Sequence, residues 1–243
     1  MKLLKLLYQR ETVAPMLALT FASGASVSLV LARIAWTGQL RYAFLVWNLF
    51  LAWLPLVFAV LACEQHRNGA KRNWRFFGLA TAWLLFFPNT PYIFTDVIHL
   101  MYGPQRHFWV DLTLILLCAL TGLVLGFVSL FLMQSVVMRL LGRAVSWFFI
   151  AGVAGLSGFG IYLGRCLRWN SWDILLNPFA LARDVGDWAA HPFASATSGA
   201  FPVLFATFLF VAYLMLYGLT HLRPTQAANL PNETTQGIED DAV

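Results

Sequence analysis

The chain has 243 residues, of which 60% are hydrophobic and only 11% charged, and its formal net charge is +5. Soluble domains contain about 25% charged residues, so this composition excludes a large water-soluble core, whose surface the few charges could not cover. The basic residues stand beside apolar runs and form no stripe with stacking aromatics on a polar domain, which disfavours a nucleic-acid-binding protein and favours a membrane protein.

Six apolar runs follow one another along the chain, and each can cross about 30 Å of hydrocarbon as a helix. The first run begins after Lys2, Lys5 and Arg10, but it is too long for the apolar part of a signal peptide, so we expect it to be retained as a span. The sequence therefore predicts an all-α fold, a polytopic bundle of transmembrane helices. The predicted spans are Val13–Ala32, Tyr42–Ala62, Trp74–Phe94, Val110–Met133, Ala144–Leu163 and Ala200–Leu222.

Domain organisation and orientation follow from the polar residues. We expect one membrane domain over residues 1–222 and a disordered polar tail over residues 223–243. Ten of the 16 Lys and Arg residues fall on the side of the N-terminus and the tail, and six fall on the other side. The positive-inside rule then places both termini in the cytoplasm. With this topology, most acidic and histidine residues outside the tail lie at the non-cytoplasmic face.

The stretch "FFPNTPYIFTDVIHL", Phe86 to Leu100, interrupts the third run. Pro88 lacks an N–H and clashes with the preceding turn, so the helix before it ends there. Thr90 as N-cap and Pro91 at the first helical position predict a second helical piece, which reaches Tyr102. The third span is therefore expected to be two helices joined at membrane depth.

The second helical piece carries a polar face. With 3.6 residues per turn, one stripe is polar and the remaining positions are apolar. A broken helix at membrane depth is tolerated only where protein or a water-filled cavity satisfies its backbone groups. We therefore expect a cavity with Asp96 and His99 on its wall; the alternative is that both side chains are solvated at the lipid–water interface. The predicted stripe consists of Tyr92, Thr95, Asp96, His99 and Tyr102.

A second polar stretch, "GRCLRWNSWD" from Gly164 to Asp173, follows the fifth run on the same side of the membrane. Arg165 and Arg168 stand one turn apart and could hold an anion or pair with a carboxylate, and the tryptophans of this stretch suit the interfacial belt. Residues 174–191, with a kink at "NPF", are predicted to form a helix along the membrane surface.

Small residues predict close helix contacts in two spans. Such residues let helix backbones approach one another in lipid, and we favour tight packing over a moving helix pair as their role. The fourth run contains Gly122-x-x-x-Gly126, and the fifth contains Gly152, Gly155, Gly158, Gly160 and Gly164.

The sequence offers only weak signs of a metal site or a known catalytic motif. Asp111, which starts the fourth run, could join Asp96, His99 and His107 as metal ligands, but D-x-x-H spacing is far less specific than H-E-x-x-H. The three cysteines form no disulfide framework, and no nucleophile elbow or phosphate-binding loop occurs in a suitable context. The identity of any metal or cofactor therefore stays open, as does the oligomeric state.

Three stretches, "FFPNTPYIFTDVIHL", "WVDL" with Asp111, and "GRCLRWNSWDIL", make the chain resemble a bacterial family of uncharacterised integral membrane proteins, domain of unknown function 1361. The likeness spans roughly Trp74 to Leu222. The resemblance implies a multi-pass protein of the bacterial cytoplasmic (inner) membrane, and it implies no activity.

We expect a polar site at the non-cytoplasmic face that binds or modifies an anionic substrate, either lipid-linked or small. The alternatives are a proton-coupled transporter and an accessory subunit of a membrane complex, so the sequence leaves open whether the protein is an enzyme. One concavity is expected to gather Asp96, His99, Asp111, Arg165 and Asn170. The candidate catalytic residues are Asp96, His99 and Asp111, and the candidate substrate-binding residues are Asn89, Tyr92, Arg165, Arg168, Asn170 and Asp173.

Overall fold

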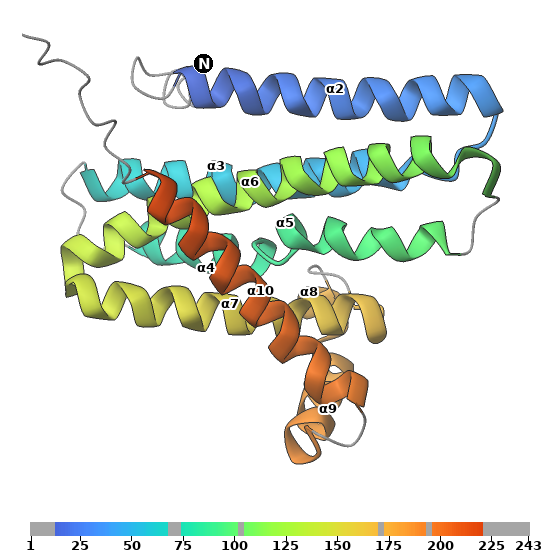
Figure 1. The fold of residues 1–243 in the computed structure, drawn as a ribbon. Coiled ribbons are helices and arrows are strands. Elements are labelled where there is room, and N and C mark those ends of the chain that lie inside the picture. The colour runs from blue at the N-terminus through green and yellow to red at the C-terminus, as the bar shows by residue number, and fades with distance from the viewer. Residues whose placement is uncertain (1–12, 68–73, 102–104, 170–172, 193–195, 221–243) are drawn as a thin grey trace, which may run out of the picture.

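The computed structural model describes residues 13–67, 74–101, 105–169, 173–192 and 196–220, and every regular element among them is a helix (Figure 1). The predicted all-α fold is therefore confirmed for this part of the chain. Five of these helices are long and apolar enough to cross a membrane, so the protein is a multi-span membrane protein. The N-terminal basic residues and the predicted disordered tail, 223–243, lie outside the described residues.

The long helices correspond to the predicted spans, although α6 continues well beyond the expected end at Met133. They are α2 (Val13–Thr37), α3 (Phe44–Arg67), α6 (Phe108–Leu141), α7 (Arg143–Cys166) and α10 (Ala196–Thr220). The third predicted span consists of α4 (Trp74–Phe86), α5 (Asn89–Tyr92) and the 3₁₀ helix η1 (Ile93–Leu100). Shorter elements complete the described chain: η2 (Gln105–His107), α8 (Asp173–Leu176) and α9 (Pro178–Ala190).

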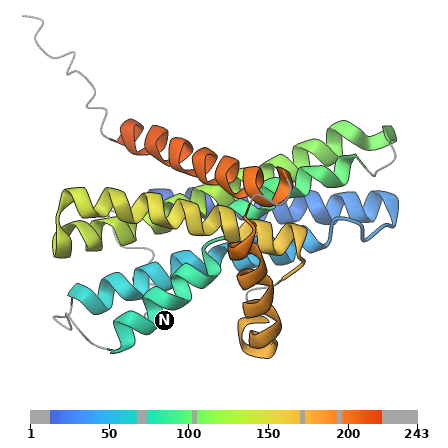
Figure 2. The same ribbon diagram turned by 90° about the horizontal axis from the view of Figure 1, so that it is seen from below.

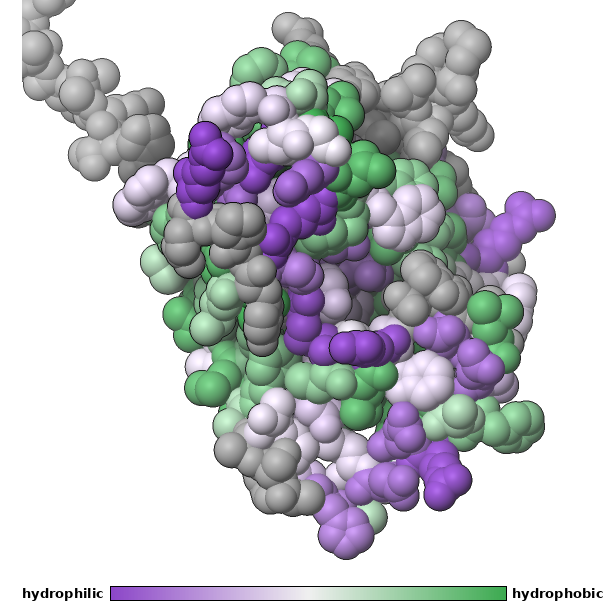
Figure 3. Space-filling model, turned by 90° about the vertical axis from the view of Figure 1, so that its right-hand side faces the viewer, coloured by the Kyte–Doolittle hydropathy of each residue, from purple (hydrophilic) through white to green (hydrophobic). Residues whose placement is uncertain are grey.

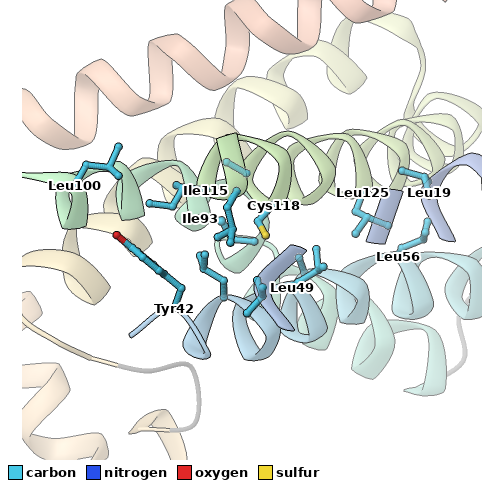
Figure 4. Close-up of a cluster of buried hydrophobic side chains, with 14 of the residues drawn as sticks. Leu19, Tyr42, Leu49, Leu56, Ile93, Leu100, Ile115, Cys118 and Leu125 are labelled. Atoms are coloured by element: carbon cyan, nitrogen blue, oxygen red, sulfur yellow. The ribbon is translucent and has the colours of Figure 1, made fainter. Parts of the chain in front are cut away.

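α6 is the central helix of the bundle. It contacts α2, α3, α5, η1 and α7, and it is the most buried of the five long helices. One hydrophobic cluster lies between α2, α3, η1 and α6 and includes Leu49, Ile93 and Ile115 (Figure 4). A second cluster joins α3, α4, α6, α7 and α10 around Trp83 and Phe127. α2 and α10 are the least buried of the long helices, and their apolar faces are left for lipid.

The break in the third span is confirmed, and α4, α5 and η1 together run from one end of the bundle to the other (Figure 1). The predicted N-cap is wrong: Thr90 lies inside α5, and its hydroxyl donates to the carbonyl of Phe87 at 3.0 Å. Pro91 has no N–H to offer that carbonyl. The amide of Asn89 likewise donates to the carbonyl of Phe86, at 2.9 Å. The backbone N–H of Thr90 also donates to the Phe87 carbonyl, at 3.0 Å, so this N–H and the two polar side chains together satisfy carbonyl oxygens at the break.

η1 has three residues per turn instead of 3.6, so residues at positions i and i+3 lie directly above one another. Asp96 and His99 form such a pair, and His99 Nδ1 lies 3.0 Å from the backbone oxygen of Asp96. The predicted α-helical geometry is therefore wrong for this segment, although both side chains still face the same side. Tyr102, the last member of the predicted stripe, lies outside the described residues.

The G-x-x-x-G pair of α6 makes room for the break. A side chain at Gly126 would overlap the side chain of Thr90, and one at Gly122 would meet the Thr90 carbonyl oxygen at 2.9 Å. α5 therefore packs directly on the backbone of α6. The close contact predicted for these two glycines is confirmed.

α7 uses three of its five glycines in the same way. Gly160 and Gly164 contact the broken segment, and Gly158 contacts the backbone of α10. Nothing lies within 4 Å of a methyl group built at Gly152 or Gly155. Close packing is therefore confirmed at three positions and wrong at the other two, where the helix surface is open.

The predicted kinked helix after α7 is present as α8 and α9, with the kink just before Pro178. α9 has no buried residue and runs across the direction of the long helices (Figure 2). The indole of Trp169 donates to Asp184 at 2.8 Å, and that of Trp188 donates to the carbonyl of Ser198 at 2.9 Å. Two indole hydrogen bonds thus hold α9 to the end of α7 and to α10.

We expect Gly126→Ala to lower the thermal stability of the purified protein in detergent, because the added methyl group overlaps the Thr90 side chain. Overpacking costs about 1–3 kcal/mol, and over most of that range the cost exceeds the roughly 1 kcal/mol that Ala contributes over Gly in a helix. Gly24→Ala in α2 is the matched control, since nothing lies within 4 Å of its methyl group, and its unfolding temperature should not fall. Equal unfolding temperatures for Gly126→Ala and the wild type would contradict the packing described.

Candidate functional site

Hydrophilic residues gather at the end of the bundle that carries η1, between hydrophobic flanks (Figure 3). Here Arg165, near the end of α7, forms an ion pair with Asp96 of η1, with 2.5 Å between Nη2 and Oδ1. The guanidinium group also donates to the hydroxyl of Thr95. Two polar stretches, whose interacting residues stand 69 and 70 positions apart, therefore converge as predicted.

The carboxylate of Asp96 is almost completely buried, with only 1% of the residue exposed. Its Oδ1 accepts from Arg165, and its Oδ2 accepts from the amide of Asn48 on α3 at 3.0 Å. A buried carboxylate requires such compensation, because removing an unpaired charge from water is very costly. With both oxygens engaged, Asp96 holds α3, η1 and α7 together and positions Arg165.

The imidazole of His99 has one fixed tautomer in its neutral form. A carbonyl oxygen can only accept, so Nδ1, which lies 3.0 Å from the carbonyl of Asp96, must carry the hydrogen. Nε2 then carries the lone pair. The ring packs against Phe44 at 4.9 Å between centroids, and Arg41 donates to the His99 carbonyl at 3.1 Å. The side chain is 36% exposed, so its ring can meet a ligand.

The guanidinium group of Arg165 lies over the ring of Tyr92, 4.4 Å from its centroid. Its Nε donates to the hydroxyl of Thr95, and its Nη2 donates to Thr95 and to Asp96. Nη1 has no hydrogen-bond partner in the described part of the chain. The side chain is 18% exposed. Asp96 therefore orients the cation without using all of its donors.

A cavity of about 620 Å³ opens beside this ion pair, between α3, the broken third span, α7 and α8–α9. Its polar end is formed by Asn48, Asp96, His99 and Arg165, whereas the polar residues Thr81 and Asn89 line the cavity from earlier parts of the third span. Most of the remaining wall is apolar: Phe44, Trp47, Leu51, Leu84, Leu85, Pro88, Leu156, Phe159, Leu163, Ile174 and Leu181. A single cavity thus combines a charged end with hydrocarbon-lined walls.

Asp111 belongs to a different cluster. Its carboxylate accepts from Arg33 of α2, with 2.6 Å between Nε and Oδ1, and from the hydroxyl of Tyr42 at 3.1 Å. Burial raises the pKa of Tyr42 above its ordinary value of 10.0, and the negative charge of Asp111 raises it further. The phenol therefore keeps its proton and donates it in this hydrogen bond. The expectation that Asp111 shares the concavity of Asp96 is wrong, because the first turn of α6 faces α2, where Arg33 supplies the counter-charge.

The other predicted residues separate into three groups. Asn89 and Tyr92 line the cavity together with Asp96, His99 and Arg165. Arg168 is exposed, and its backbone is in the left-handed region, with φ of 62°. Arg168 and Asp173 do not line the cavity, but Ile174, the neighbour of Asp173, does. Asn170 lies outside the described residues. The four predicted metal ligands do not gather, and within the described ranges no three His, Cys, Asp or Glu residues are arranged to hold a metal ion.

Sequence reasoning missed partners that come from distant parts of the chain. In the sequence, Arg33 contributed only to the prediction of membrane orientation, and Asn48, inside an apolar run, was not predicted to belong to the site. A guanidinium or an amide at membrane depth is costly unless it has a partner. That cost is the signal that could have identified both residues as components of buried polar clusters.

A family model described as "Protein of unknown function (DUF1361)" matches residues 47–216, more than half of the chain, and this range includes the broken third span, α6 and α7. No curated protein and no solved structure matches the chain.

We expect Asp111→Asn to lower the unfolding temperature in detergent, because it leaves the buried cation of Arg33 without a counter-ion. Breaking a buried pair by removing one partner costs about 3–5 kcal/mol. The double variant Arg33→Gln/Asp111→Asn keeps hydrogen-bonding groups and leaves no buried charge, so it should regain most of the loss. A double variant that is less stable than Asp111→Asn alone would contradict this account of the pair.

Proposed function

The chain belongs to the family described as Protein of unknown function (DUF1361), and on that premise we propose that it binds an amphipathic ligand, an anionic lipid or a lipid-linked molecule. The binding site is the cavity between α3, the broken third span, α7 and α8–α9. One observation carries this proposal: the guanidinium group of Arg165 and a wall of aliphatic and aromatic side chains line the same cavity.

The size and lining of the cavity support a ligand site. Pockets for small molecules usually enclose about 300–1,000 Å³ and combine a mostly apolar lining with a few convergent polar groups. The volume of about 620 Å³ falls in this range, and Asn48, Asp96, His99 and Arg165 form one connected polar group in its wall. A wholly hydrophilic solute would leave most of the apolar wall uncovered, whereas an amphipathic molecule matches both parts.

The charge of the ligand follows from Arg165. Its planar guanidinium group offers paired donors to phosphate or carboxylate oxygens, and Nη1 has no partner among the described residues. Asp96 keeps the cation compensated when no ligand is bound. An anionic headgroup at this end would therefore complete the hydrogen bonds of a cation that is already positioned.

His99 is the group in the cavity best suited to act on the headgroup. Its Nδ1 is used by the Asp96 carbonyl, and its Nε2 is left with a lone pair. That atom can accept a hydrogen bond, or a proton, from a hydroxyl group of the ligand. Binding and modification of the ligand would thus share the same arrangement of residues.

We place the cavity at the non-cytoplasmic face, because ten of the 16 basic residues lie on the opposite side of the predicted spans. Reporter fusions at Gly69 and after Arg223 should therefore give cytoplasmic signals, and a fusion at Arg106 should give a non-cytoplasmic signal. A non-cytoplasmic signal at Gly69 would move the cavity to the cytoplasmic face.

Long-chain phosphatidic acid is a suitable probe, with phosphatidylcholine as the lipid without net charge and inorganic phosphate as the anion without a chain. We expect the purified protein to bind phosphatidic acid more tightly than either, measured by titration with native mass spectrometry. Arg165→Gln should weaken this binding roughly 10- to 150-fold, because a hydrogen bond to a charged group contributes about 1.5–3 kcal/mol.

Two further variants serve as controls. Arg168→Gln removes the same charge from an exposed residue outside the cavity and should stay within about twofold of the wild type. The double variant Arg165→Gln/Asp96→Asn avoids an uncompensated carboxylate, so it separates loss of binding from loss of folding. If this double variant folds and binds phosphatidic acid as tightly as the wild type, Arg165 does not hold the headgroup and the proposal is wrong.

A further inference from the structure

Phe159 of α7 lines two hollows. One is the main cavity. The other, the chain groove, has a volume of about 300 Å³ and lies between α7, α9 and α10. α7 and α9 border both spaces: Leu156 and Leu181 line the main cavity, whereas Gly155 and Trp188 line the chain groove. The side chain of Phe159, in contact with Trp188 at 4.4 Å between centroids, therefore stands between the two spaces.

Among the described residues, the chain groove offers no polar partner to a headgroup. None of its described lining residues is charged, and the indole N–H of Trp188 is already donated to the carbonyl of Ser198 at 2.9 Å. α10 contributes small and aliphatic side chains, among them Val203, which is 59% exposed, and Ala206. A hollow that is apolar and short of hydrogen-bond partners suits hydrocarbon and not water.

We propose that the hydrocarbon chain of the ligand passes Phe159 and lies in the chain groove. This inference rests on the proposed function and makes it more specific: the ligand is a long-chain amphiphile, with its headgroup at Arg165 and its chain between α7, α9 and α10. Because Phe159 lines both spaces, they are neighbours separated at this side chain, and one long ligand that passes it would fill both. A small free anion would fill only the polar end of the main cavity.

The test compares dioleoyl with dihexanoyl phosphatidic acid, which share a headgroup and differ in chain length. Gly155→Leu places a side chain in the groove without a backbone clash, because nothing lies within 4 Å of a methyl group at this position. Gly152→Leu is the matched control: it has the same open surroundings on the same helix and lines neither hollow. Binding is measured by titration of each full-length variant with each lipid.

Gly155→Leu should weaken dioleoyl binding by about tenfold or more, equivalent to excluding roughly two methylene groups, and should leave dihexanoyl binding unchanged. Gly152→Leu should match the wild type with both lipids. If both lipids bind through Arg165 but the two leucine variants behave alike, the chain-groove inference is overturned and the proposed function stands. If the wild type binds neither lipid, the proposed function fails, and the inference fails with it.

A second measurement uses the unmodified protein, so it does not depend on the folding of a variant. A phosphatidic acid with a photoreactive group at the end of its chain should label residues 196–206 of α10. Excess dioleoyl phosphatidic acid should suppress this labelling. Labelling that the unlabelled lipid cannot suppress would mean that bulk lipid alone fills the groove, which overturns the inference.

Discussion

At membrane depth, no water is available to satisfy an interrupted backbone or a buried carboxylate. The third span brings both into the bundle, at the Pro88 break and at Asp96. The break is tolerated because Asn89 and Thr90 donate to nearby carbonyls, and the carboxylate is tolerated because Arg165 compensates it. α3 and α7 each supply a partner to this carboxylate, through Asn48 and Arg165, and α6 packs against the broken segment at Gly122 and Gly126.

The Arg33–Asp111 pair is buried on both sides and the Arg165–Asp96 pair only at its carboxylate, so they compensate a buried charge in different ways. Arg33 and Asp111 form a closed pair, completed by the hydroxyl of Tyr42 and away from the cavity. Asp96 and Arg165 form a pair that lines the cavity, and Nη1 of the guanidinium group donates to no described residue. The first arrangement joins α2 to α6 and serves stability. The second gives the protein a compensated charge that a ligand can still contact.

The same segment connects packing to the cavity. Because glycines of α6 and α7 let the broken segment approach their backbones, Tyr92 is held beside Arg165 in the wall of the cavity. Within η1, the 3₁₀ geometry places His99 over Asp96 and sets the orientation of its ring. The site is therefore built from one irregular segment that regular helices clamp on both sides, and this accounts for its polar character in an apolar bundle.

The sequence by itself determined the class of protein, the spans and the position of the break, because the length of an apolar run and the missing N–H of Pro88 are local properties. It also identified Asp96 and Arg165, since charges near apolar runs are few. Only the tertiary structure decided that Asp111 pairs with Arg33, that Asn48 completes the site and that η1 is a 3₁₀ helix. Such pairings depend on how each helix is rotated toward its neighbours, and spacing along one chain segment does not encode that rotation.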